Sequence, residues 1–365
     1  MRKHVLFFVH GMGAYVNDKG EPDNTWFDDA KNALKEQYDK YPFVKYKPFE
    51  DTFELVYINY DTEIFKLVKR WQDESEKMLA TAIPAAPEKK LVGWLNNAAQ
   101  LDNNFAWSHA ACVILYRYFP LMRQRIKIHV ATQFHKALAP NSDGAVSTWS
   151  VIAHSLGTIV THDVLWAMDS STPVQAGISV LDAMVPSANV IAMLANVSKV
   201  LETDAKVYES VVVPQSMVQN QSACYNYLNY NNEFDPFVLP APFDPLAPDV
   251  TPRVREPWAL AKANGTYLDI SIRNVHEVNV HSIRNYLVNP AVHIPLLEKL
   301  VGVGSITKQE KDAAQEQFEN VPTAKIKRQF DKIQTDLRQE LKRESKESVW
   351  FTRVGKFFAR CNQVS

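Results

Sequence analysis

One serine in this sequence lies in a pattern that could turn its hydroxyl group into a nucleophile. Ser155 is the centre of Ala153-His154-Ser155-Leu156-Gly157, within the segment WSVIAHSLGTIV. A nucleophilic serine on a tight strand-to-helix turn needs small residues two positions before and two positions after it, because larger side chains would clash. Ala153 and Gly157 meet this need. The N–H groups at the start of the following helix would favour negative charge that develops in the reaction.

A second motif, His10-Gly11-Met12-Gly13, follows an apolar segment near the start of the chain. A strand that ends in His-Gly can direct a backbone N–H group into a site at the edge of a sheet. We therefore predict an oxyanion hole formed by the N–H groups of Met12 and Leu156, which would bind a tetrahedral intermediate. The alternative interpretation is a glycine turn after a buried strand.

Strands and helices alternate along the part of the chain that carries these motifs. The predicted strands are His4 to Val9, Phe53 to Tyr60, Trp149 to Ala153, Ile178 to Leu181, Ala223 to Tyr230 and Tyr267 to Val275. A helix is predicted from Gly157 to Met168, directly after the serine turn. This alternation predicts an α/β fold with a mostly parallel central sheet flanked by helices.

The connection between the second and third predicted strands is unusually long. Roughly 90 residues separate them, whereas a crossover unit needs only about 30. Apolar residues within this connection recur mainly at three- and four-residue steps, and one helical stretch is predicted from Met122 to Leu138. We expect a large helical insert at about residues 62–142, which either packs against the core or covers the site.

The composition changes after about residue 305, where glycine and proline become rare and charged residues dominate. We therefore divide the chain into a main domain, residues 1–305, and a charged helical C-terminal extension, residues 306–365. The last part of this extension, Val349 to Cys361, mixes aromatic and basic side chains. Such a mixture is typical of an amphipathic helix that makes peripheral contact with a membrane, and it suits docking onto the core or a partner equally well.

The overall composition limits the classes of partner and compartment. The formal net charge is −1, so the charge balance does not favour a nucleic-acid partner. The three cysteines are widely spaced and form no disulfide or zinc pattern, which fits a reducing compartment. The N-terminal apolar run is about six residues long, too short for a signal-peptide core, and no stretch approaches the ~18 apolar residues of a membrane span. We expect a cytoplasmic protein, and the sequence leaves its oligomeric state open.

Together these segments resemble the α/β-hydrolase superfamily, in particular its lipase and esterase branch. The resemblance is carried by VHGMG, AHSLG, the NEFDPF segment after one strand and the HSIRNYL segment after the last strand, and it covers roughly residues 4–300. The long helical insert departs from the family's pattern. In this family the nucleophile, the acid and the histidine follow one another in that chain order, and the order here is consistent with it.

The resemblance also implies which residues would complete the site. Asp235 is the implied acid, because it follows a strand and precedes a proline as in the family's acid loop. Asp182, in ISVLDAMVP, is an alternative, because some lipases carry the acid after the preceding strand, and Asp244 in a proline-rich loop is a third candidate. His281 is the implied base, since it lies after the last strand and leads into a helix, and His276 is its rival.

The implied activity is that of a serine hydrolase that cleaves carboxylic esters through an acyl-enzyme, with a small ester or a lipid as substrate. Esterase, lipase and phospholipase activities all fit this expectation. A thioesterase or an amidase would use the same Ser-His-Asp triad, and a catalytically inactive hydrolase fold used for binding or scaffolding is a further alternative. No cofactor or metal is expected, because the histidines and acids lack a metal-binding spacing such as HExxH.

Overall fold

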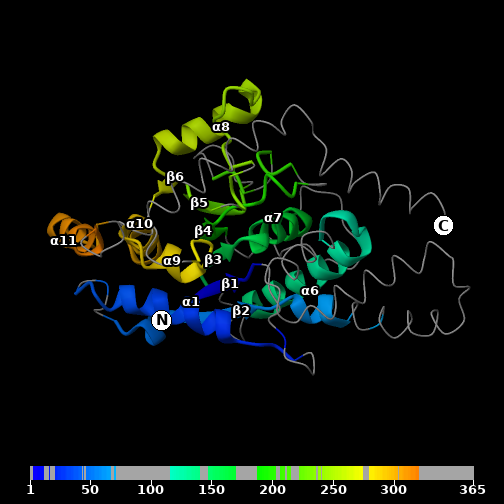
Figure 1. The fold of residues 1–365 in the computed structure, drawn as a ribbon, viewed down its shortest axis with the longest axis horizontal. Helices are drawn as coiled ribbons and strands as arrows, with labels where there is room; N and C mark the ends of the chain where they lie inside the picture. Colours follow the sequence, from blue (N-terminus) through cyan, green and yellow to red (C-terminus); the bar gives the residue numbers. More distant parts are fainter. Residues whose placement is uncertain are drawn as a thin grey trace, which may run out of the picture.

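The computed structural model contains a parallel sheet with helices packed around it (Figure 1). The structure describes residues 3–11, 16, 21–42, 44, 47–66, 70, 116–139, 147–169, 187–202, 206–209, 212–214, 222–235, 237–239, 241–273, 279–302 and 304–319. Within these residues, six strands pair into one sheet.

The strands are β1 (His4–Val9), β2 (Phe53–Ile58), β3 (Trp149–His154), β4 (Ala188–Leu194), β5 (Cys224–Asn232) and β6 (Tyr267–Ile272). They lie in the order β2-β1-β3-β4-β5-β6, and every neighbouring pair is parallel. The chain adds β2 on one side of β1 and then adds β3 to β6 successively on the other side. The direction in which the sheet grows therefore reverses between β1 and β3. The expected parallel sheet flanked by helices is confirmed.

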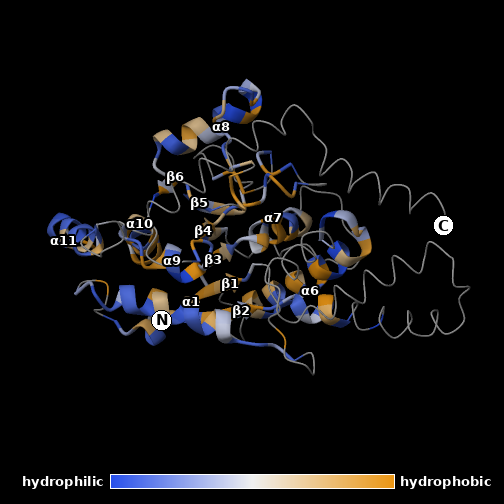
Figure 2. Cartoon of the chain, in the orientation of Figure 1, coloured by the Kyte–Doolittle hydropathy of each residue, from blue (hydrophilic) through white to orange (hydrophobic). Residues whose placement is uncertain are grey.

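The central strands β1, β3 and β4 are largely apolar because both faces of the sheet are covered. β1 is buried from Val5 to Val9, and all six residues of β3 are buried. Figure 2 shows this concentration of apolar residues in the strands, whereas the outlying helix α11 (Lys308–Glu319) is mostly hydrophilic. Burial of each large apolar side chain stabilises the fold by about 1.5–3 kcal/mol, so these strands form a rigid base for the loops at their ends.

The helices form two groups, one on each side of the sheet (Figure 1). The described helices besides α11 are α1 (Thr25–Tyr38), α2 (Phe49–Thr52), α6 (Pro120–Leu138), α7 (Leu156–Met168), α8 (Pro252–Ala263), α9 (Ile283–Leu287) and α10 (Pro290–Val301). α1, α9 and α10 pack against one another, and α6 packs against α7. α7 is buried over nearly its whole length, and it contacts both the sheet and α6.

The fourth strand is the main difference between the predicted and observed elements. The predicted strand at 178–181 lies outside the described residues, and the sequence prediction missed β4. Apolar residues at positions 190, 191, 193, 194 and 197 have the spacing of a helix face. This segment is nevertheless a strand, because it pairs with β3 on one side and β5 on the other.

The insert and the C-terminal extension are described in part. α6 confirms the helix predicted from Met122 to Leu138. α11 begins the charged extension, and of its residues only Phe318 is buried. The segment from Val349 to Cys361 lies outside the described residues. Among the helices that the structure describes, none combines the length and the apolar character needed to cross a membrane.

Candidate active site

Ser155, Asp235 and His281 all lie beyond the carboxyl ends of parallel strands. Ser155 directly follows β3, Asp235 follows β5 after a short turn, and His281 comes after β6. Because parallel strands present their carboxyl ends at the same edge, these three segments from distant parts of the chain converge there. The serine also lies where the order of strands reverses between β1 and β3, which is the usual place for a ligand site in an open α/β sheet.

The backbone at Ser155 has the strained conformation of a nucleophile elbow. Its φ is 54° and its ψ is −126°, and such a positive φ costs a residue other than glycine about 1–3 kcal/mol. Two backbone hydrogen bonds hold the turn, from Ser155 N–H to Leu194 O at 3.0 Å and from Thr158 N–H to Ser155 O at 2.9 Å. α7 begins at Leu156, so its first-turn N–H groups, which have no acceptor within the helix, start directly after the serine.

Two glycines allow the end of β1 to approach this turn closely. A Cβ atom on Gly157 would lie 2.4 Å from the carbonyl oxygen of His10 and 2.6 Å from that of Val9. A Cβ atom on Gly11 would lie 2.6 Å from the Cβ of Ser155. Side chains at either position would therefore push the loop after β1 away from the serine. This contact explains why the turn requires a small residue at position 157.

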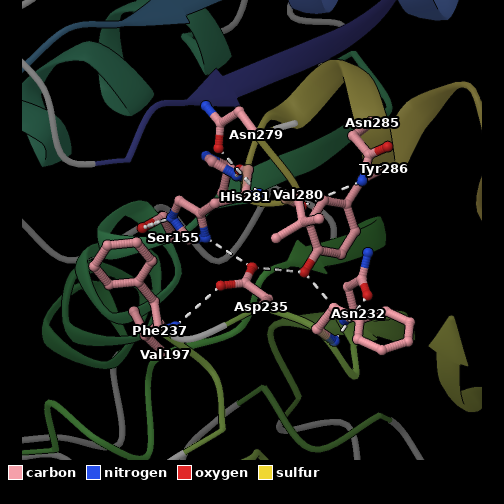
Figure 3. Close-up of polar contacts among 12 residues, drawn as sticks. Ser155, Val197, Asn232, Asp235, Phe237, Asn279, Val280, His281, Asn285 and Tyr286 are labelled. Atoms are coloured by element: carbon pink, nitrogen blue, oxygen red, sulfur yellow. Dashed lines mark hydrogen bonds and ion pairs between the residues drawn. The ribbon is translucent and has the colours of Figure 1, made fainter. Parts of the chain in front are cut away.

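A chain of hydrogen bonds joins the three predicted residues (Figure 3). Ser155 Oγ lies 2.8 Å from His281 Nε2, and His281 Nδ1 lies 2.7 Å from Asp235 Oδ2. An ionised carboxylate only accepts hydrogen bonds, so Nδ1 carries the imidazole proton and Nε2 accepts from the serine hydroxyl. The exposed fraction is 0% for Ser155 and Asp235 and 5% for His281. A substrate can therefore reach Ser155 Oγ only when surrounding groups move.

The surroundings of Asp235 keep its carboxylate ionised. Burial by itself would raise the pKa of Asp235, but the electrostatic interaction with His281 and the hydrogen bonds that the carboxylate accepts lower this pKa below its ordinary value. Oδ2 accepts from His281 and, at 2.9 Å, from the Tyr286 hydroxyl, while Oδ1 accepts from Phe237 N–H at 3.0 Å. Three donors on two oxygens fix both the charge and the orientation of the group.

Asp244, the one rival residue that the structure describes, makes its printed hydrogen bonds outside this group. Asp244 binds a backbone N–H in its own loop, and its own N–H donates to the Tyr208 hydroxyl. Asp182 and His276 lie outside the described residues. Asp182 was predicted to follow the strand that precedes β5. In the structure that strand is β4, which begins after Asp182, and the residues that follow β4 are those around Asn196.

The loop after β1 is anchored by His10 and Tyr60. The Tyr60 hydroxyl donates to the carbonyl oxygens of His10 at 2.8 Å and Gly11 at 3.1 Å, and His10 Nδ1 donates to Gly11 O at 2.6 Å. Burial lowers the pKa of His10 to about 3, so its Nε2 stays neutral and accepts from Tyr60 N–H at 3.2 Å. Of the two predicted oxyanion donors, Leu156 begins α7, and Met12 lies outside the described residues.

His154, the residue before Ser155, contacts the loop that carries His281. Its Nε2 donates to the carbonyl oxygen of His281 at 2.7 Å, and the two imidazole rings lie 4.9 Å apart. Burial is the main reason that the pKa of His154 falls to about 3. A neutral His154 therefore ties the backbone of His281 to the end of β3 without adding a charge beside the imidazole.

Several contacts of this site were not predicted from the sequence. The bonds of Tyr286 to Asp235, of His154 to His281 and of Tyr60 to the loop after β1 join residues far apart in the chain. The one available signal was the position of Tyr286 in the HSIRNYL segment, on the short helix α9 that follows His281. No property of Tyr60 in the sequence pointed to the site.

The described residues contain no group of three or more His, Cys, Asp or Glu side chains arranged to hold a metal ion. No protein-family model matches this chain, and comparisons with curated proteins and with solved structures also find no match. Conclusions about the chemistry of this site therefore rest on its own geometry.

Proposed function

We propose that this protein is a serine hydrolase that cleaves carboxylic esters, with Ser155 as nucleophile, His281 as general base and acid, and Asp235 as the acid that orients the imidazole. One observation carries the proposal, namely the continuous hydrogen-bond chain from Ser155 Oγ through His281 to Asp235 Oδ2, with distances of 2.8 and 2.7 Å. The strained turn at Ser155 supports it further, because positive φ at a serine is costly and persists mainly where function needs it.

In the first half-reaction, Ser155 Oγ attacks the carbonyl carbon of the ester while its proton passes to His281 Nε2. The carbonyl π pair moves onto the oxygen and forms a tetrahedral oxyanion. The start of α7, including Leu156 N–H, supplies backbone donors and a positive dipole end for this charge. When the intermediate collapses, the alcohol leaves with the proton from His281, and the acyl group stays on Ser155.

In the second half-reaction, water attacks the acyl carbon and gives its proton to His281 Nε2. The second tetrahedral intermediate then collapses, and His281 returns the proton to Ser155 Oγ as the carboxylic acid is released. Asp235 stabilises the imidazolium that forms in both steps, which is why its ionised state matters. One ester and one water thus yield one acid and one alcohol, and the protein is restored.

Carboxylic esters are the proposed class because the sequence motifs resemble those of the lipase and esterase branch of the α/β-hydrolases. The centroid of the Phe237 ring lies 4.6 Å from that of the His281 ring (Figure 3). Apolar contacts of this kind would stabilise the acyl part of a substrate. Thioesters and amides would pass through the same steps, so they belong in the same assay.

A fluorophosphonate probe, which phosphonylates activated serines, tests the proposal directly. The wild-type protein should be labelled, and Ser155→Ala should abolish labelling. Ser150→Ala is a matched control, because Ser150 Oγ also lies 2.8 Å from a histidine nitrogen, His4 Nε2. The other ring nitrogen of His4 contacts the Thr148 hydroxyl and not a carboxylate, and Ser150 lies within β3. This variant should be labelled like the wild type. Labelling that survives Ser155→Ala would refute the proposal.

The substrate class is then measured with nitrophenyl esters of graded chain length, a phospholipid, an acyl thioester and an anilide. Turnover of an ester that exceeds that of the matched thioester and anilide supports the proposed class. A wild-type protein that is neither labelled nor active on any of them would instead favour a binding role for the fold.

A further inference from the structure

Tyr286 contacts the acid of the site from a direction that the Ser-His-Asp scheme does not use. Its hydroxyl lies 2.9 Å from Asp235 Oδ2, the same oxygen that accepts from His281 Nδ1 (Figure 3). Tyr286 lies on α9, which begins two residues after His281, and its side chain is fully buried. One short segment of chain therefore supplies both donors to Oδ2.

The direction of the Tyr286 hydroxyl proton is determined by a second contact. The backbone N–H of Asn232, at the end of β5, donates to the Tyr286 oxygen at 3.1 Å. This hydrogen bond occupies a lone pair of the Tyr286 oxygen, and the carboxylate of Asp235 can only accept. The hydroxyl group of Tyr286 therefore donates its proton to Asp235. Burial, and next the charge on Asp235, raise the pKa of Tyr286 well above its ordinary value, so the proton stays on the phenol.

We propose that Tyr286 is a positioning residue that tunes the triad by holding Asp235 Oδ2 in place and drawing negative charge from it. This inference rests on the proposed function. The hydroxyl and His281 Nδ1–H compete for the electron density of one oxygen. Removing the hydroxyl leaves more negative charge facing the imidazole, so protonation of the triad becomes easier and occurs at higher pH.

The effect depends on which other ionisable groups face Asp235. Among the described residues these are His281, Tyr286 and His154. Burial lowers the pKa of His154 to about 3, so it stays neutral in the range where the acidic limb of the pH–rate profile lies. A shift of that limb in a Tyr286 variant therefore reports on the bond between Tyr286 and Asp235.

Tyr286→Phe is the first variant. It should move the acidic limb of kcat/KM to higher pH by roughly half a unit. We expect kcat to fall about tenfold with little change in KM, because the loss is in orientation of the base and not in substrate binding. Tyr38→Phe is the matched control, since this buried hydroxyl also makes two hydrogen bonds, to Lys47 O and Thr52 Oγ1, far from the triad. It should leave the limb unchanged.

The second variant replaces Tyr286 with 3-fluorotyrosine, which keeps the ring and makes the hydroxyl a stronger donor. It should move the acidic limb to lower pH. If Tyr286→Phe does not fold, this variant by itself tests the role of the Tyr286 hydroxyl. A limb that stays at the wild-type position, or that moves to higher pH with the stronger donor, overturns the role of Tyr286. Labelling by fluorophosphonate and ester turnover of the wild type are measured first, because the absence of both refutes the proposed function itself.

Discussion

Four buried histidines should make the folded protein lose stability steeply when the pH falls from 7.5 to 5.5. His10, His154, His162 and His293 are at most 4% exposed. Burial lowers the pKa of each from its ordinary 6.5 to about 3. In the unfolded chain the same side chains reach water and titrate near pH 6.5.

The sign of the effect follows from which state binds protons first. The folded pKa lies below the unfolded one, so the unfolded chain takes up protons as the pH falls. The stabilising contribution is complete above about pH 6.5 and is lost progressively as the pH falls from there toward 3. At pH 5.5 each histidine costs about 1.4 kcal/mol and the four together about 6 kcal/mol, comparable with the whole ~5–15 kcal/mol of a typical domain. In the unfolded chain, carboxyl groups titrate near pH 4, which is below this range.

The free energy of unfolding is measured by urea titration at several pH values, with a check that the slope against urea stays constant. His162→Gln removes one of the four groups and should reduce the pH-dependent loss by about 1.4 kcal/mol. An unfolding free energy that stays constant between pH 7.5 and 5.5 would refute the reasoning.

The remaining predictions concern the acid and the turn. Asp235→Asn should reduce kcat by at least about a thousandfold while the protein stays folded, and the same collapse in Asp182→Asn with an active Asp235→Asn would show that the acid was misassigned. Gly157→Ala should lower the free energy of unfolding by about 2–4 kcal/mol and abolish activity, because its Cβ would meet two carbonyl oxygens at 2.4 and 2.6 Å. Gly265→Ala meets no atom within 4 Å, so in thermal and urea unfolding it should cost only about 1–2 kcal/mol of left-handed strain.

Much of the sheet could be predicted because its strands carry a local signal. β1 and β3 are largely apolar runs that end at glycine-containing turns, as expected for buried parallel strands. β4 could not be predicted in the same way, since its apolar residues continue at helical spacing into the next segment. Pairing with β3 and β5 decides its structure, and that pairing involves residues dozens of positions away.

The choice among acids shows the same limit. The three candidate acids all lie among predicted loop residues, namely Asp235, Asp182 and Asp244. The neighbouring residues in the sequence do not show which of them reaches the histidine. Only the folded chain brings Asp235 to within 2.7 Å of His281 and places Asp244 in other contacts. Distances of this kind depend on how β5 and β6 align, which is a property of the whole sheet.

The sequence by itself determined the nucleophile turn, because a tight strand-to-helix turn needs small residues at fixed positions around Ser155 and the chain encodes that need over five residues. The tertiary structure decided everything that holds the turn's partners in place. Tyr286 reaches Asp235 across 51 positions, His154 reaches the backbone of His281 across 127, and Tyr60 fixes the loop after β1 from 50 positions away. Hydrogen bonds across such separations form only after the sheet has assembled, so no local pattern in the sequence records them.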